Sequence, residues 1–180
     1  MRDVKKLLLV VLVSILVFVL VVAYLMYSAS HPPRNPPPNF GMGWDTTDTQ
    51  GFEDVVPKAE DTGEANFTLA KGKTGIAVIF TYVSASNVKL WNGSFRIGGP
   101  QYWMENFTLP SWLNVTFDPA YFIVETSGQK ARVRVIITAS PTSPTLSDPI
   151  DIPYSLNCIP LEKADIPEVT LGSIFRLKII

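Results

Sequence analysis

The sequence predicts an all-β protein: one antiparallel β-sandwich ectodomain, preceded by a single N-terminal transmembrane α-helix. Three observations lead to this prediction. Positions 7–27 form an uncharged apolar run, apolar and polar residues alternate from position 65 onward, and Gly- or Pro-containing turn sequences separate the alternating stretches. Beyond the apolar run, a chain of 180 residues has room for one domain of ordinary size.

The apolar run has the length and composition of a membrane span. Residues 7–27 read LLLVVLVSILVFVLVVAYLMY, with Ser14 as the clearly polar break. About 20 such residues in a helix match a hydrocarbon core of about 30 Å, and a helix satisfies its own backbone hydrogen bonds in lipid. Three basic residues precede the run: Arg2, Lys5 and Lys6. The positive-inside rule therefore predicts that residues 1–6 are cytoplasmic and that the C-terminal domain is extracytoplasmic.

A cleaved signal peptide is the alternative for the same run. Ser28-Ala29-Ser30 is an acceptable small-residue cleavage site. The run is longer, however, than the usual apolar region of about 7–15 residues in a signal peptide. The sequence therefore favours a signal-anchor that stays in the cell membrane.

Residues 28–64 are predicted to be a linker. The segment begins with a Pro-rich stretch, and polyproline is a stiff spacer that rises about 3.1 Å per residue. An acidic, Thr-rich part follows, whose composition predicts little burial. Three apolar exceptions in it are expected to dock on the domain or on a partner: Phe40, Trp44 and Phe52.

Residues 65–180 are predicted to form the β-sandwich. Leu113, Val115 and Phe117 alternate with polar residues, as expected for strands with one buried face. Asn92-Gly93 is typical of a turn. Pro153 interrupts a further alternating stretch and predicts an edge strand or a bulge there.

The C-terminal stretch, residues 168–180, leaves two possibilities open. It ends in bare apolar residues, Ile179 and Ile180. The stretch either completes the sheet of its own domain, which we expect, or pairs with a neighbouring molecule by strand addition.

Several of these stretches resemble a known family of modules. They are Asn66-Phe-Thr-Leu, Gly75-Ile-Ala-Val-Ile-Phe, residues 109–119 (LPSWLNVTFDP) and residues 131–141 (ARVRVIITASP). Over residues 65–156 the chain resembles the immunoglobulin-like sandwich modules of prokaryotic, notably archaeal, cell-surface proteins. The resemblance implies adhesion, spacing or assembly rather than catalysis. The sequence departs from the family near Asp148-Pro149, where such modules usually carry a Gly before a Tyr-led strand.

Four Asn-x-Ser/Thr sequons predict N-glycosylation: Asn66, Asn92, Asn106 and Asn114. Asn66 and Asn114 fall on the outward phase of predicted strands. Asn92 is expected in a turn and Asn106 in a loop. A glycan needs this exposure, although polar residues also occupy outward strand positions for other reasons.

An aromatic-rich segment, residues 98–112, predicts a contact surface for a protein partner. Trp and Tyr are enriched in binding hot spots, and the candidate contact residues are Tyr102, Trp103 and Met104. Phe107 and Trp112, in the same segment, are expected to cap the sandwich core instead.

Composition argues against several classes of function. The chain has 15 basic and 16 acidic residues and a net charge of −1, so no global field favours nucleic acid. A single His, His31, and a single Cys, Cys158, are too few for a copper site, an ordinary zinc site or a Ser-His-Asp triad. The acidic residues after Asp45 lack the spacing of a calcium loop. No cofactor is predicted, and Cys158 is expected to be buried and inert rather than cross-linking.

The sequence thus predicts a non-catalytic, membrane-anchored surface protein that binds or scaffolds in the cell envelope. The alternative is an accessory subunit of a larger membrane or extracellular machine, such as an archaellum stator-like component. A carbohydrate-active enzyme is a third and weaker hypothesis, which would need a pair of carboxylates among Glu105, Asp118, Glu125 and Asp151.

Overall fold

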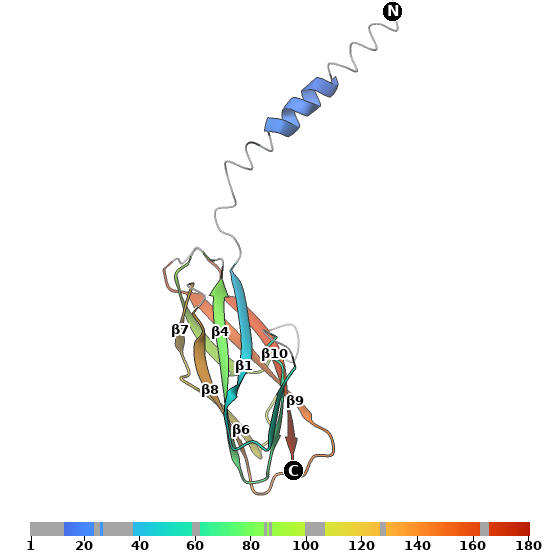
Figure 1. The fold of residues 1–180 in the computed structure, drawn as a ribbon, viewed down its shortest axis with the longest axis vertical. Coiled ribbons are helices and arrows are strands. Elements are labelled where there is room, and N and C mark those ends of the chain that lie inside the picture. The colour runs from blue at the N-terminus through green and yellow to red at the C-terminus, as the bar shows by residue number, and fades with distance from the viewer. Residues whose placement is uncertain are drawn as a thin grey trace, which may run out of the picture. The chain divides into compact units, whose positions relative to one another are not determined.

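The computed structural model describes residues 13–23, 26, 38–58, 62–84, 86, 88–99, 107–126, 129–162 and 166–180. The chain divides into two compact units, Met1–Pro36 and Pro37–Ile180. In the first unit, residues 13–23 are helical and exposed (Figure 1). Searched over its described residues, the chain contains no helix with both the length and the hydropathy of a membrane span.

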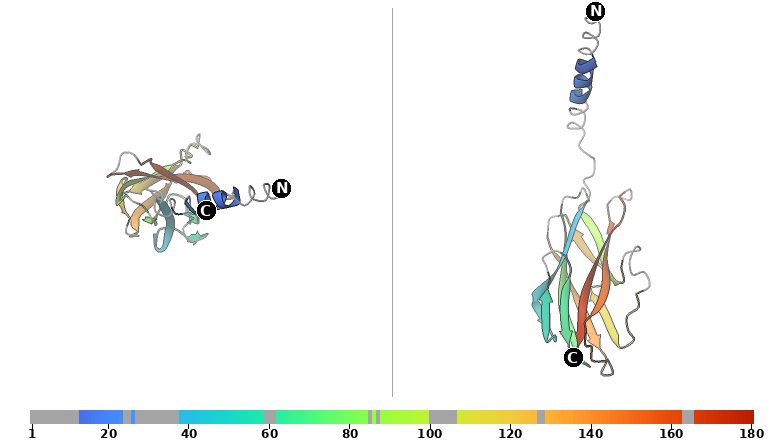
Figure 2. Two further views of the ribbon diagram at one scale, coloured as in Figure 1. Left: turned by 90° about the horizontal axis from the view of Figure 1, so that it is seen from above. Right: turned by 90° about the vertical axis from the view of Figure 1, so that its right-hand side faces the viewer.

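The second unit, here called the strand unit, consists of two β-sheets in its described residues. The four-stranded sheet has the order β1 (Asn39–Gln50), β4 (Thr74–Ser84), β8 (Ala131–Ala139) and β6 (Leu113–Asp118). The six-stranded sheet has the order β2 (Asp54–Pro57), β3 (Ala65–Leu69), β10 (Val169–Ile179), β9 (Ile150–Pro160), β5 (Leu90–Ile97) and β7 (Phe122–Glu125). The two sheets form two layers (Figures 1 and 2).

One hydrophobic core lies between the sheets. Side chains from both layers meet in it, among them Ile79 and Val135 of the four-stranded sheet and Phe67 and Leu156 of the six-stranded sheet, each at most 1% exposed. In β6, Leu113 and Val115 are buried whereas Asn114 and Thr116 are exposed, as the alternation predicted. The prediction of a β-rich domain with two sheets is confirmed for the described residues.

One strand pair departs from the predicted antiparallel arrangement. β10 pairs with β3 in parallel, from Phe175 opposite Ala65 to Ile179 opposite Leu69. The pairs β10–β9 and β3–β2 are antiparallel. Because β3 is followed by a crossing to the other sheet, no hairpin fixes its direction against β10, and a parallel pair can form.

The predicted linker, residues 28–64, is wrong over its second half, because β1 and β2 belong to the strand unit. Met42 and Trp44 of β1 are buried in the core, and Phe40 and Phe52 pack against it. The three apolar exceptions thus dock on the domain itself. The acidic composition of this segment predicted that little of it would be buried. Phe40, Met42 and Trp44 nevertheless place one face of β1 on the core, because alternate residues of a strand point to the same face.

The acidic residues of β1 also have a partner in the sheet. Arg132 of β8 lies 2.7 Å from a carboxylate oxygen of Asp45 and 3.3 Å from one of Asp48. Thr47 donates from its hydroxyl and its N–H to Asp45, and these bonds, with the charge of Arg132, lower the pKa of that carboxyl. The acidic residues of β1 from which a solvated linker was predicted therefore lie on the outer face of the four-stranded sheet, paired with Arg132.

Glycines in the strands lie beneath aromatic rings. An added Cβ at Gly41 would lie 2.4 Å from the ring of Tyr82, and one at Gly43 would lie 2.6 Å from the ring of Phe80. Gly75 meets Phe52 and Gly93 meets Phe122 in the same way, at 2.3 and 2.4 Å. Each ring occupies the space that a side chain on the neighbouring segment would need.

The predicted turn at Asn92-Gly93 is wrong for this reason. Both residues lie within β5, where Gly93 is opposite Phe122 of β7 and Cys158 of β9. The glycine serves close packing of the Phe122 ring rather than a reversal of the chain.

The predicted edge or bulge at Pro153 is also wrong, because β9 lies inside the six-stranded sheet, between β10 and β5. The carbonyl of Pro153 accepts a hydrogen bond from the N–H of Gly98 at 2.9 Å, one residue beyond the end of β5. The N–H and C=O of a residue paired in an antiparallel ladder point to the same side. The side of Pro153 that lacks an N–H therefore faces the end of β5, where pairing with β9 stops, so no hydrogen bond of the ladder is lost.

The C-terminal strand completes its own sheet, as we expected. Ile179 is fully buried and opposite Leu69, and the N–H of Ile180 donates to the carbonyl of Leu69 at 3.1 Å. The C-terminus of the strand unit lies at the end opposite the start of β1 (Figure 1).

The contact between Gly93 and Phe122 yields a stability prediction. Gly93→Ala adds a methyl group where the ring lies, and we expect a loss of about 1–3 kcal/mol in the free energy of unfolding, measured by urea titration. Adding Phe122→Leu should recover part of the loss. In a chain produced without N-linked glycans, Ser94→Ala, one residue along on the outer face, is the matched control and should change stability by less than about 0.5 kcal/mol. Equal losses in Gly93→Ala and Ser94→Ala would contradict the packing explanation.

Candidate functional site

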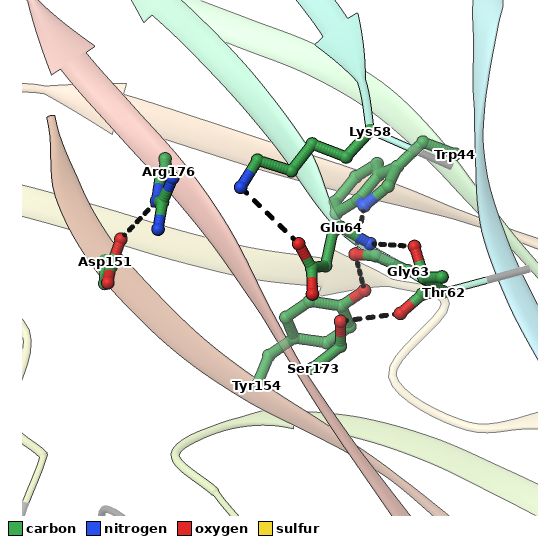
Figure 3. Close-up of polar contacts among 9 residues, drawn as sticks. All are labelled: Trp44, Lys58, Thr62, Gly63, Glu64, Asp151, Tyr154, Ser173 and Arg176. Atoms are coloured by element: carbon green, nitrogen blue, oxygen red, sulfur yellow. Dashed lines mark hydrogen bonds and ion pairs between the residues drawn. The ribbon is translucent and has the colours of Figure 1, made fainter. Parts of the chain in front are cut away.

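The segment Thr62–Glu64, here called the Gly63 segment, joins the two sheets at one edge of the strand unit. Thr62 forms a parallel bridge with Met42 of β1. The carbonyl of Gly63 accepts hydrogen bonds from Trp44 Nε1 at 2.6 Å and from the Tyr154 hydroxyl at 2.5 Å (Figure 3). The Ser173 hydroxyl donates to the carbonyl of Thr62 at 2.8 Å. Three strands, β1, β9 and β10, thereby hold one short backbone segment.

Position 63 requires glycine on two grounds. Its φ is +68°, in the left-handed region that other residues rarely adopt. An added Cβ would also lie 2.4 Å from the Tyr154 hydroxyl and 3.2 Å from that of Ser173. A side chain at position 63 would therefore displace the Tyr154 and Ser173 hydroxyls from their carbonyl acceptors.

The donors around Gly63 are buried and fixed. Tyr154 is fully buried, and burial raises the pKa of its phenol well above the usual value. The phenol therefore stays protonated and keeps donating at any physiological pH. Rings of Trp44, Tyr154 and Phe175 also pack edge-on or tilted, with centroids about 6 Å apart. The donors Trp44, Tyr154 and Ser173 each form a hydrogen bond with a backbone carbonyl of the Gly63 segment. We call this arrangement the Gly63 clamp.

A small cavity lies beside the clamp. Its volume is about 70 Å³, and Lys58, Glu64, Ala65, Ile174 and Arg176 line it. Two ion pairs occupy its rim: Lys58 with Glu64 at 3.6 Å, and Arg176 with Asp151 at 2.8 Å (Figure 3). The charges of the cavity are thus largely satisfied within the protein, and its size suits a few water molecules.

A wider hollow opens where β5 begins and β7 ends. Its volume is about 470 Å³, and Lys89, Leu90, Glu125, Thr126 and Glu162 line it. Glu162 accepts a hydrogen bond from the N–H of Lys89 at 3.2 Å. Pockets of about 300–1,000 Å³ are the size class that holds small ligands.

The carboxylates considered for catalysis are not gathered in one place. Asp118 pairs with Arg134 and Asp151 with Arg176, on different sheets, whereas Glu125 lines the hollow. Glu105 lies outside the described residues. Across the described ranges, no group of three or more His, Cys, Asp or Glu side chains is placed to hold a metal ion.

The sequons stand in different surroundings. Asn114 is exposed on β6, an edge strand. Asn66 is half-buried on β3, and its Oδ1 is enclosed without a hydrogen-bond partner. Asn92 is half-buried on the outer face of β5, and Asn106 lies outside the described residues. Exposure therefore favours Asn114 as a modification site and disfavours Asn66.

The candidate partner contacts, Tyr102, Trp103 and Met104, also lie outside the described residues. Phe107 and Trp112, from the same segment, are partly buried and pack against the core, as we predicted. The segment containing the candidate contacts connects β5 of one sheet with β6 of the other.

Sequence reasoning did not find the clamp at Gly63. Trp44 is one of the apolar exceptions in the predicted linker, and Tyr154 follows Pro153 in an alternating stretch. Their common acceptor, however, is 19 residues away from Trp44 and 91 residues away from Tyr154. The local sequence signal for this site is Gly63 itself, a glycine between polar residues just before a predicted strand, which is typical of a turn.

Comparisons with known proteins leave the family open. No protein-family model matches the chain, and no curated protein matches its sequence. A family 123 glycoside hydrolase from Clostridium perfringens is similar in structure with a TM-score of 0.42 and 12% identity, covering 78% of this chain. The chain spans 27% of the length of that hydrolase.

Two further solved structures are similar at the same level. A FixG-related protein from Vibrio parahaemolyticus has a TM-score of 0.37 and 8% identity, covering 79% of this chain and 98% of that one. The N-terminal domain of PorA has a TM-score of 0.37 and 14% identity, covering 70% and 97%. These are distant β-rich structures, from which no function is inferred.

The shared acceptor at Gly63 predicts non-additive substitutions. Tyr154→Phe and Trp44→Phe each remove one donor and leave the carbonyl one partner, which should cost about 0.5–1.5 kcal/mol in urea unfolding. Trp44→Phe also removes part of a buried ring, so its loss should be larger by about 1–2 kcal/mol. The double variant leaves a buried carbonyl unpaired, and its loss should exceed the sum of the two single losses by about 1 kcal/mol. Strictly additive losses would show that the two donors act independently.

Burial of Cys158 predicts a protected thiol. The residue is a free cysteine with 1% exposure, and burial raises the pKa of its thiol to about 12. Because thiolate is the reactive form, we expect no alkylation by iodoacetamide at pH 8 in the folded chain and complete alkylation in urea. The raised pKa means that folding opposes ionisation, so stability should fall as pH rises from about 9 toward 12. Rapid alkylation of the folded chain would contradict this placement.

Proposed function

We propose that this protein is a non-catalytic, single-pass membrane protein that displays its strand unit outside the cell for binding or scaffolding. The observation that carries the proposal is the juxtaposition of an uncharged run at 7–27 with a strand unit that begins about ten residues later, at Pro37. An uncharged apolar run of 21 residues preceded by basic residues supports a span with a cytoplasmic N-terminus.

The strand order supports the immunoglobulin-like part of the proposal. Immunoglobulin domains have strands A, B, E and D in one sheet and C, F and G in the other. The order β1-β4-β8-β6 corresponds to A-B-E-D, and β10-β9-β5 corresponds to G-F-C. β7 departs from that plan, since it follows β6 in the sequence but pairs with β5 in the other sheet. Sandwiches of this type in prokaryotic surface proteins resemble this chain in their sequence pattern.

The two ends of the strand unit support a display role. The chain enters it at Asn39, and Ile180 lies at the far end (Figure 1). A tether at the first end leaves the second end and the outer faces of both sheets available to partners. Tyr102, Trp103 and Met104 remain the proposed contacts for such a partner.

Membrane fractionation of cells producing the full chain with a C-terminal tag tests the proposal. We expect the chain in the membrane fraction after carbonate washing, and the tag to be lost when external protease is added to intact cells. Leu16→Arg/Val17→Arg, which places two charges in the apolar run, is the matched variant and should abolish membrane retention. A carbonate-soluble wild-type chain, or a tag protected in intact cells and cleaved only after lysis, would contradict the proposal.

Purification from mild detergent separates the main proposal from the subunit alternative. A stoichiometric complex with other membrane proteins would favour an accessory subunit of a larger machine. Capture of a soluble or cell-surface partner that is lost in Trp103→Ala would favour a binding protein.

A further inference from the structure

The outer face of the six-stranded sheet carries an exposed apolar strip. Ile123 of β7 is 49% exposed, Ile159 of β9 is 45% exposed, and Leu161, just beyond β9, is 52% exposed. Phe122 and Val124 of β7 and Cys158 of β9 face the core, so the two isoleucines face outward by alternation. Together these side chains form an exposed apolar patch, and covering such a patch would remove apolar surface from water, which is favourable.

Asn92 stands between the two isoleucines. In the register of the sheet it lies directly opposite Ile123 on one side and Ile159 on the other. Directly opposed residues have Cβ atoms about 4.5–5.5 Å apart, so the three side chains form one row across β7, β5 and β9. The side-chain amide of Asn92 forms no hydrogen bond with the described residues.

Asn92 is also the acceptor residue of an Asn-Gly-Ser sequon. We propose that an N-linked glycan on Asn92 covers Ile123 and Ile159. This inference rests on the proposed function, because the sequon must be exposed to the glycosylation machinery outside the cytoplasm. It goes beyond that function in assigning the modified residue and what the glycan does there.

The chemistry of the surroundings fits a sugar better than a flat protein partner. The ring hydrogens of a sugar present apolar patches that pack on aliphatic side chains, while its hydroxyls need donors and acceptors. The hollow beside Asn92 supplies both: Leu90, two residues earlier on the same face, forms part of its wall, and Lys89, Glu125 and Glu162 surround it. A sequon at the centre of the strip would place a glycan in the middle of any protein interface, which favours the glycan as the occupant.

The other described sequons provide contrast within the same chain. Asn114 is exposed on the edge strand β6, opposite Thr138, and its surroundings contain no comparable exposed isoleucines. It is therefore an internal reference for glycosylation without shielding.

Ser94 provides a matched pair of variants. Ser94→Ala destroys the sequon and Ser94→Thr retains it, and both variants keep Asn92, Ile123 and Ile159. The full chain would be produced in a host that transfers N-linked glycans to secreted sequons, purified in detergent, and analysed by glycopeptide mass spectrometry. We expect a glycan mass on the Asn92 peptide in wild type and Ser94→Thr, its loss in Ser94→Ala, and modification of Asn114 in all three.

Shielding is read separately by hydroxyl-radical footprinting of the same samples. Oxidation of Ile123 and Ile159 should rise at least twofold in Ser94→Ala relative to Ser94→Thr, with Val56 on β2, 45% exposed, as the unchanged reference. An Asn92 peptide without glycan, while the protease test places the strand unit outside the cell, would overturn this inference and leave the proposed function standing. A modified Asn92 with equal footprints in the two variants would overturn the shielding role. A protease test that places the strand unit inside the cell would overturn both.

Discussion

The carbonyl oxygen of Gly63 links the two sheets by hydrogen bonds, in addition to the hydrophobic core that lies between them. It accepts from Trp44 of the four-stranded sheet and from Tyr154 of the six-stranded sheet, so one backbone atom belongs to the hydrogen bonding of both layers (Figure 3). A buried carbonyl that loses its partners costs more than a hydrogen bond gains, which makes such an acceptor a strict constraint. The Gly63 segment also covers the edge of β1 at Met42, where an open strand could pair with another molecule.

Pairing of glycine with an aromatic ring recurs through the strand unit and links sequence to packing. Gly41, Gly43, Gly75 and Gly93 each leave space that a neighbouring Tyr or Phe fills. In three of these pairs the ring comes from the residue directly opposite in the register, and in the fourth it comes from Phe52, just beyond β1. Glycine weakens a strand on its own, but here each one permits a large ring to cover the backbone.

The sequence was informative where local alternation decides the outcome. β6, β8 and β10 were predicted because each has one buried and one exposed face, and period two reveals that directly. β1 escaped prediction because its second half is polar and acidic, and the ion pairs of Asp45 and Asp48 with Arg132 join residues far apart in the sequence. The parallel β3–β10 pair and the Gly63 clamp were beyond sequence reasoning for the same reason. Both are contacts between distant segments, which no local pattern records.

The position of β10 sets the order in which the chain can become ordered. This last strand lies between β3 and β9, so the six-stranded sheet lacks its middle until the final residues are available. Contacts of such long sequence separation form late, because the chain must first close a large loop. A chain that emerges N-terminus first can therefore form β2–β3 and β7–β5–β9 as two separate sets of strands, which β10 joins last. Until β10 is in place, one edge of β3 and one edge of β9 lack a neighbouring strand.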